Sequence, residues 1–102
     1  MSRMEKLTKL FEVDPSDADV AYMIAQEHAK AGEHEEAQAW DDKCLALDGS
    51  YHYAYFHKAR SQQADGDDEG ARSTLETGLG VATRDQNAKA MSEISSFLGE
   101  LA

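Results

Sequence analysis

The stretches AGEHEEA (residues 31–37) and DGDDEGA (residues 65–71) share one pattern, and the second begins thirty-four residues after the first. In both, a glycine is followed by acidic residues and then by an alanine. Glycine permits a sharp turn, and acidic side chains favour the positively polarised start of a helix. The pattern therefore predicts one structural joint used twice, in which a turn leads into a helix.

A shift of the whole chain by thirty-four residues extends the match beyond the two turns. Aromatic, small, apolar and turn positions coincide together, in the pairs Tyr22 and Phe56, Ala25 and Ala59, Gly32 and Gly66, Glu35 and Glu69, Ala37 and Ala71, Leu45 and Leu79, and Leu47 and Val81. We expect the four paired alanines to lie where helices cross closely. The layers between helices should be filled by Ile24, Leu45, Leu47, Leu75, Leu79 and Val81. Such a period indicates stacked repeats of one supersecondary unit.

Hydrophobic periodicity and capping residues predict six helices, at about residues 3–12, 18–30, 35–47, 51–64, 67–82 and 86–101. Pro15 cannot continue the first of them, and Asp17 can cap the second. The loops are short, so consecutive helices should be antiparallel neighbours. The predicted fold class is all-α, in a single domain over residues 1–102.

The composition restricts the classes of partner. The chain has 41% hydrophobic and 29% charged residues and a formal net charge of −10. A surface this acidic repels the phosphates of nucleic acids and of anionic membranes. Cys44 is the only cysteine, which excludes an internal disulfide and a thiolate metal cluster. We see no signal peptide and no apolar run long enough for a transmembrane helix, so the expected location is cytoplasmic.

A calcium loop is the main alternative reading of the second joint. Asp65, Asp67, Glu69, Gly70 and Glu76 nearly match the spacing of the ligands and the glycine in a calcium-binding helix–loop–helix. Glu69 is too long for its position, however, and Arg72 stands where such a loop directs an apolar side chain inward. The repeat also accounts for the same residues, so we predict no metal site and keep calcium binding as the alternative.

No pattern of catalytic residues is present. The histidines, His28, His34, His52 and His57, lack the four-residue spacing that directs two imidazoles at one metal. We expect His28 at a helix crossing and the other three as surface or interface residues. Cys44 lies on an apolar helix face, where an inert buried thiol is expected. The acidic pair Asp41 and Asp42 is interpreted as a solvated helix face. We therefore predict neither an enzyme nor a cofactor.

The thirty-four-residue helix–turn–helix unit resembles the tetratricopeptide repeat (TPR) family. The resemblance implies a solenoid of about six antiparallel helices: a half-repeat at residues 1–17, full repeats at 18–51 and 52–85, and a C-terminal capping helix at 86–102. Several positions depart from the family pattern. Asp41 and Leu75 replace a bulky aromatic residue, and Cys44 and Gly78 replace an alanine.

The resemblance also implies a function, because the first helix of each unit lines a concave groove that receives a peptide or partner protein. The matching positions are Asp19, Tyr22, Gln26, Lys30, Tyr53, Phe56, Arg60, Gln63 and Asn87. The clamp for C-terminal carboxylates known in one sub-class is not supported, since Tyr22, Gln26, His57, Asn87 and Met91 occupy its places. We predict a non-catalytic interaction module that is a monomer or a weak homodimer, with self-association as a further alternative.

Overall fold

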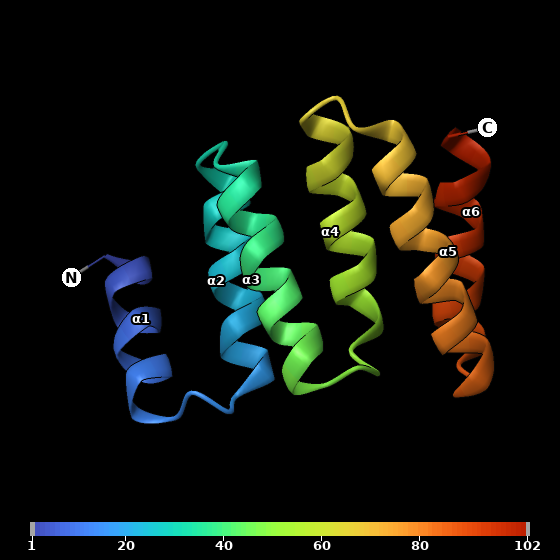
Figure 1. Cartoon of the computed structure of the whole chain (residues 1–102). Coiled ribbons are helices and arrows are strands. Elements are labelled where there is room, and N and C mark those ends of the chain that lie inside the picture. Colours follow the sequence, from blue (N-terminus) through green and yellow to red (C-terminus); the bar gives the residue numbers. More distant parts are fainter. Residues whose placement is uncertain (1, 102) are drawn as a thin grey trace.

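The structure is a computed structural model that describes residues 2–101. Within that range the chain forms six α-helices and no strand. Their bounds are α1 Arg3–Val13, α2 Ala18–Lys30, α3 His34–Leu47, α4 His52–Ala64, α5 Asp68–Arg84 and α6 Ala88–Leu101. They follow one another along an elongated body of 41 × 29 × 17 Å, with α1 and α6 at opposite ends (Figure 1). The all-α prediction is confirmed.

The predicted joints take the form that the sequence pattern requires. Gly32 and Gly66 have φ angles of +77° and +81°, which glycine adopts readily. After each turn the chain bonds back to the preceding helix: the N–H of Glu33 donates to the carbonyl of His28 at 2.9 Å, and that of Asp67 to Gln62 at 2.8 Å. The first and second repeats therefore turn by the same helix-ending hydrogen bond.

Packing between the helices buries the small residues at the positions predicted. Ala25, Ala37, Ala59 and Ala71 have no exposed surface, so the helices of each unit cross closely there. Ile24 and Leu75 are also fully buried, whereas Leu47 keeps 40% of its surface and does not fill a layer as predicted. Leu47 is the last residue of α3.

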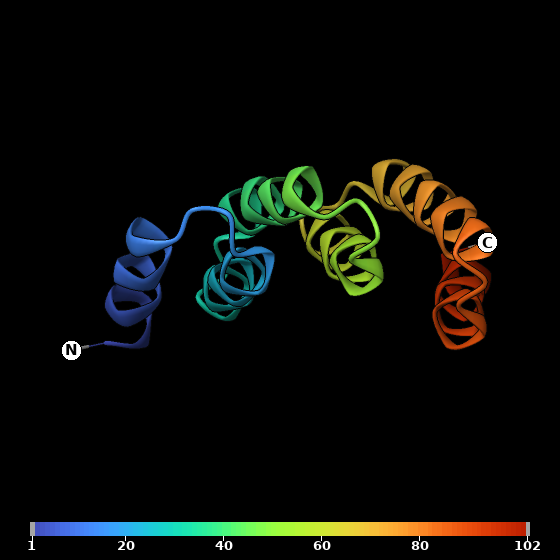
Figure 2. The same ribbon diagram turned by 90° about the horizontal axis from the view of Figure 1, so that it is seen from below.

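The array is curved. Seen from below, α2, α4 and α6 lie on its inner side, and α3 and α5 lie on its outer side (Figure 2). The two sides meet in apolar clusters, of which the largest joins α4, α5 and α6 and consists of Ala59, Ala71, Leu75, Ala82, Ala90, Ile94 and Phe97. Among residues 2–101, none of the helices combines the length and the apolar character needed to cross a membrane.

Candidate functional site

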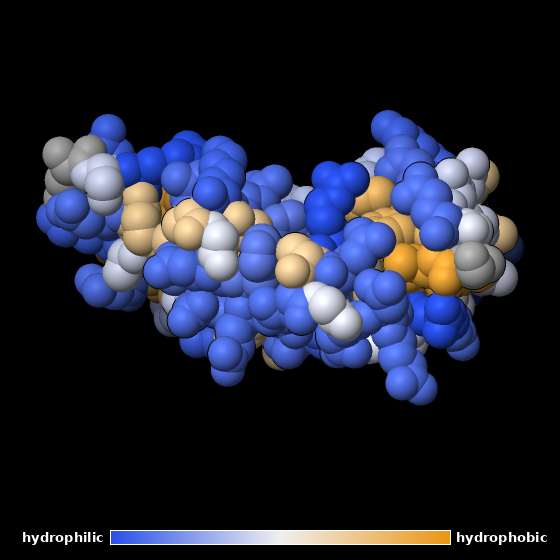
Figure 3. All heavy atoms as spheres, turned by 90° about the horizontal axis from the view of Figure 1, so that it is seen from above, coloured by the Kyte–Doolittle hydropathy of each residue, from blue (hydrophilic) through white to orange (hydrophobic). Residues whose placement is uncertain are grey.

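The concave side carries an open cleft between α4 and α6. It has a volume of about 360 Å³ and is lined by Phe56, Arg60, Ser92, Glu93, Ser96, Phe97 and Glu100. Figure 3, which looks at the molecule from above, shows apolar atoms exposed among polar ones in the C-terminal part of the chain. An apolar floor with a polar rim is the composition of a site that binds another molecule by burying an anchor side chain.

Two phenylalanines form the floor. The rings of Phe56 on α4 and Phe97 on α6 pack edge to face, with centroids 5.0 Å apart. Phe97 is 4% exposed and belongs to the core, whereas Phe56 is partly buried. The guanidinium carbon of Arg60 lies 5.3 Å from the centroid of the Phe56 ring. The core thus holds the floor rigidly, and Arg60 supplies positive charge at its edge.

Tyr53 extends the apolar surface along α4. It is 43% exposed, and it lines a second, smaller hollow with His52, Phe56, Ala90, Glu93 and Ile94. Phe56 and Glu93 line both hollows, so the two form one continuous strip between α4 and α6. Three of the residues predicted for the groove, Tyr53, Phe56 and Arg60, therefore meet on this strip.

The predicted groove residues of α2 form a separate group with internal partners. The Tyr22 ring lies 5.1 Å from the ring of Tyr51 and 5.5 Å from that of His57. The hydroxyl of Tyr51 donates to Asp19 at 2.7 Å. Burial raises the pKa of Tyr22, which keeps this phenol neutral. Asp19 and Tyr22 thus join α2 to the start of α4.

The remaining predicted residues are Gln26 and Lys30 on α2 and Gln63 on α4. They lie nearer the C-terminal ends of these helices. Lys30 is exposed and pairs with Glu27 at 3.1 Å, and Glu27 also pairs with Arg3 at 3.3 Å. Gln26 is half-buried and Gln63 is exposed. The positive charge of Lys30 is therefore partly neutralised by a neighbour, unlike that of Arg60.

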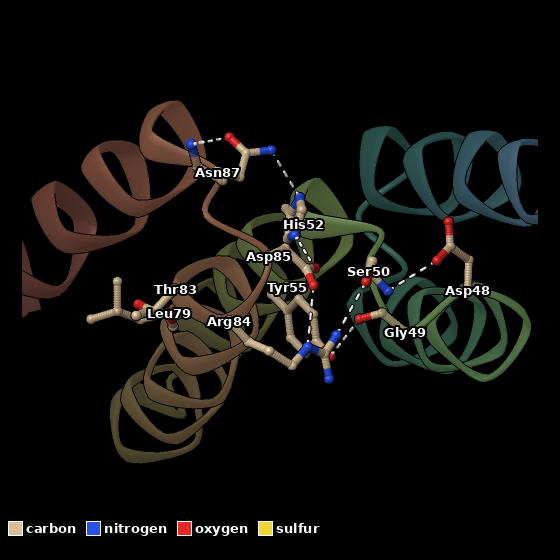
Figure 4. Close-up of polar contacts among 11 residues, drawn as sticks. Asp48, Gly49, Ser50, His52, Tyr55, Leu79, Thr83, Arg84, Asp85 and Asn87 are labelled. Atoms are coloured by element: carbon tan, nitrogen blue, oxygen red, sulfur yellow. Dashed lines mark hydrogen bonds and ion pairs between the residues drawn. The ribbon is translucent and has the colours of Figure 1, made fainter.

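Asn87, the last predicted groove residue, is held in a polar chain at the joint between α5 and α6 (Figure 4). Its side-chain oxygen accepts from the N–H of Ala90 at 3.0 Å, which fixes the amide so that its nitrogen lies 3.1 Å from Nδ1 of His52. Because that nitrogen can only donate, Nδ1 accepts, and Nε2 carries the proton donated to Asp85 at 2.8 Å. Asn87 thus caps α6 and orients a neutral His52.

The same joint ties the second repeat to the first. Arg84 bonds to Asp85 at 3.1 Å and reaches the Ser50 hydroxyl at 3.2 Å, across thirty-four residues of sequence. The hydroxyl of Tyr55 donates to the carbonyl of Gly49 at 3.1 Å. Hydrogen bonds from Ser50, His52 and Arg84 lower the pKa of Asp85 to about 2.

One buried polar pair corrects a prediction from the sequence. Asp41 is 0% exposed and accepts from Nδ1 of His57 at 2.7 Å, so it is not part of a solvated helix face. Its neighbour Asp42 is exposed and pairs with Lys58 at 2.7 Å. Desolvation raises the pKa of Asp41, against the opposing effect of His57. No motif within a single helix signals this pair, because its members come from different helices.

Two curated proteins are similar to this chain over most of its length. The sequence matches no family model. It is 31% identical over 97 residues to the SGT1 homolog of Oryza sativa subsp. japonica, although the chain spans 26% of that protein. It is 28% identical over 98 residues to a TPR repeat-containing protein of Pseudomonas aeruginosa, and the match covers 96% of this chain and 93% of the relative.

Solved structures with the same repeat fold are also similar to this chain. A tetratricopeptide repeat domain protein from Salinibacter ruber superposes with a TM-score of 0.79 and 26% identity, over 86% of this chain and 89% of that one. The chain therefore has the tetratricopeptide repeat fold and is similar in sequence to proteins of that family. The TPR2B domain of yeast Sti1, solved in a complex with pHsp70, has the same fold at 24% identity, with a TM-score of 0.88 over 96% of this chain and 78% of that domain.

Within the repeat frame, the Asp41–His57 pair occupies a defined place. Thirty-four residues later the frame reaches Leu75 and Met91, so one interface between repeats is polar where the next is apolar. This relation was the sequence signal that could have found the pair. An acid at a position that is apolar in the sister repeat is expected to be buried and hydrogen-bonded.

The calcium alternative does not match the geometry of the second joint. Asp67 accepts from the N–H of Gly70 at 2.9 Å and caps α5. Because α5 begins at Asp68, Glu76 lies on the helix, about 13 Å along its axis from Asp67 at 1.5 Å per residue. In residues 2–101 no group of three or more His, Cys, Asp or Glu side chains is arranged to hold a metal ion. Asp67 thus serves the start of α5.

Proposed function

We propose that this chain is a non-catalytic protein-interaction module whose concave side binds a peptide or a partner protein. The observation that carries the proposal is the cleft between α4 and α6, where the partly exposed Phe56 ring, backed by the buried Phe97, lies within a polar rim. A preformed apolar surface can bury an anchor side chain without first being ordered, which reduces the cost of binding.

Two further observations support it. The Sti1 domain of the same fold was solved with pHsp70, which places partner binding within this architecture. The predicted groove residues Tyr53, Phe56 and Arg60 are an exposed aromatic, a partly buried aromatic and an arginine, the types that contribute most to binding energy at interfaces. The proposal assigns partner contact to them first.

The proposal includes a cytoplasmic location and excludes nucleic acids and membranes as partners. Its support is the net charge of −10, which opposes binding to phosphate-rich surfaces, and the free, buried Cys44. Self-association is the second candidate. It is favoured by Leu10 and Val13 on α1, which are 54% and 84% exposed. Light scattering at increasing concentration tests it, and a strictly monomeric mass would exclude it.

A blocking substitution tests the main proposal. Ser96 is exposed and lines the cleft, whereas Ser95 is equally exposed on α6 but does not line it. We expect Ser96→Trp to fill the cleft and to weaken the binding of peptides selected from a random displayed library by at least about tenfold. Ser95→Trp is the matched control and should keep their affinity. Selected peptides that bind both variants equally well would contradict the proposal.

A further inference from the structure

Two carboxylates of the cleft have no recorded partner among residues 2–101. Glu93 and Glu100 on α6 line it, and among the described residues the structure records no ion pair or hydrogen bond for either side chain. Several other acids do have such partners, as Asp19, Asp67 and Asp85 do. Glu93 and Glu100 are therefore free to pair with groups that come from outside.

The spacing of these carboxylates defines the geometry of what they can bind. They are seven residues apart on one helix, hence on nearly the same face and about 10 Å apart along the axis. In a peptide with the polyproline II conformation, side chains three residues apart lie on one side and span about 9 Å, because that helix has three residues per turn and rises about 3.1 Å per residue. The Phe56–Phe97 floor lies beside both carboxylates in the same cleft.

Charge favours a basic ligand over an acidic one. Within the cleft two carboxylates face a single guanidinium, that of Arg60. The rest of the chain adds to the excess of acid, because the net charge is −10. The summed field steers cations towards the protein and repels acidic segments.

We propose that the cleft recognises a basic segment with an apolar anchor, in which two lysine or arginine residues three positions apart flank one aromatic or aliphatic residue. The anchor packs on Phe56 and Phe97, and the cations pair with Glu93 and Glu100. This inference rests on the proposed function and specifies its partner. The volume of the cleft, about 360 Å³, is at the small end of the range for ligand pockets. It suits a single anchor residue and its neighbours.

Fluorescence anisotropy with labelled twelve-residue peptides tests it. The basic probe carries one phenylalanine between two lysines at the three-residue spacing, the acidic probe has glutamates in place of the lysines, and the third probe has alanine in place of phenylalanine. At low salt we expect the basic probe to bind at least about tenfold more tightly than either of the others, with the advantage over the acidic probe shrinking as salt is added.

Substitutions of opposite sign sharpen the test. Glu93→Gln with Glu100→Gln should weaken binding of the basic probe about tenfold, and Glu93→Lys with Glu100→Lys should weaken it further by replacing attraction with repulsion. The control is Glu12→Gln with Glu76→Gln, which makes the same change of charge at exposed positions on α1 and α5 that do not line the cleft. It should leave the affinity nearly unchanged.

The outcomes separate this inference from the proposed function. Equal or tighter binding of the acidic probe, or an effect of the cleft glutamines no larger than that of the control pair, overturns the inference. If displayed peptides without basic residues are then blocked by Ser96→Trp, the concave side still binds partners and only the basic specificity is wrong. If Ser96→Trp blocks no selected peptide of any composition, the proposed function fails as well.

Discussion

The carboxylate of Asp41 lies out of solvent between α3 and α4, where His57 is its hydrogen-bond partner at 2.7 Å. Its other oxygen has no hydrogen-bond partner among the described residues. Breaking a buried pair by removing one member leaves an uncompensated charge, whereas replacing both members by apolar residues is often neutral or stabilising. The repeat itself offers the replacement, because Leu75 and Met91 stand at the same positions one unit later.

We therefore expect His57→Met alone to lower the free energy of unfolding by about 3 kcal/mol. The double variant Asp41→Leu/His57→Met should be at least as stable as the parent. Urea denaturation of the parent, Asp41→Leu, His57→Met and the double variant measures these free energies of unfolding. A double variant as unstable as His57→Met would show that the pair does more than satisfy its own burial.

The loss of unfolding free energy caused by His57→Met should also depend on pH. Burial already raises the pKa of Asp41 above 3.8, and removal of His57 takes away an opposing effect. A carboxyl group with a raised pKa in the folded state costs stability above that pKa and costs none below the unfolded value. The loss seen at neutral pH should thus diminish as the pH falls towards 3.8.

Asp85 should affect the pH dependence of stability in the opposite direction to Asp41. Hydrogen bonds from Ser50, His52 and Arg84 lower its pKa from 3.8 to about 2. Its contribution is present above the unfolded value and is lost as the pH falls from about 4 to about 2. Asp85→Asn should flatten the pH dependence of the urea midpoint in that window, and the exposed Glu76→Gln serves as the control for charge. An unchanged slope would exclude this joint as an acid-sensitive contact.

At the scale of the element, the sequence pattern was sufficient to place all six helices. The observed bounds differ from the predicted ones by at most two residues at either end. The larger differences fall at the joint between α5 and α6, where the sequence has no glycine. There Gln86 adopts φ = 57°, and the N–H of Asn87 bonds to the carbonyl of Ala82 at 2.9 Å, as at the two glycine joints.

This third joint predicts a stabilising substitution. A residue with a Cβ costs about 1–2 kcal/mol in the left-handed region, and glycine avoids that cost at the expense of chain entropy. Gln86→Gly should raise the free energy of unfolding by roughly 0.5–1 kcal/mol. Gly66→Ala, at φ = +81°, should lower it by a similar amount. Thermal unfolding of both variants measures the difference, and equal signs would contradict the shared turn.

Two glycines within α5 make a second comparison. A Cβ on Gly78 would lie 2.7 Å from Cβ of Tyr55, whereas one on Gly80 would meet nothing within 4 Å. Gly80→Ala should stabilise the protein by about 0.5–1 kcal/mol through helix propensity. Gly78→Ala should destabilise it, because α4 and α5 must move apart. A gain in melting temperature for both variants would show that the two helices can separate at no cost.

The sequence was less informative about side-chain partners than about helices. Tyr22 and Asp19 were predicted to line the groove, and the sequence did not indicate that both also contact Tyr51. The repeat frame specifies which face of a helix a residue occupies, but contacts between units depend on the crossing of helices distant in sequence. Asp41 and His57 illustrate this, since sixteen residues and a turn separate them.

At the scale of the whole molecule, the inner and outer sides of the curved array consist of different helices and carry different residues. Its inner side joins α2, α4 and α6, and the strip of Tyr53, Phe56, Arg60 and Glu93 lies there (Figure 2). The outer side belongs to α3 and α5, whose first turns carry acids. The central claim is that partners bind the inner side.

Chemical-shift mapping measures this most directly. The ¹⁵N-labelled protein is titrated with a peptide selected from a random displayed library, and the amides that shift are located. The claim predicts that the largest changes cluster at Tyr53, Phe56, Arg60, Glu93 and Ser96, on α4 and α6. Largest changes on the outer side, around Leu47, Glu76 and Gly80, with the cleft unaffected, would contradict it.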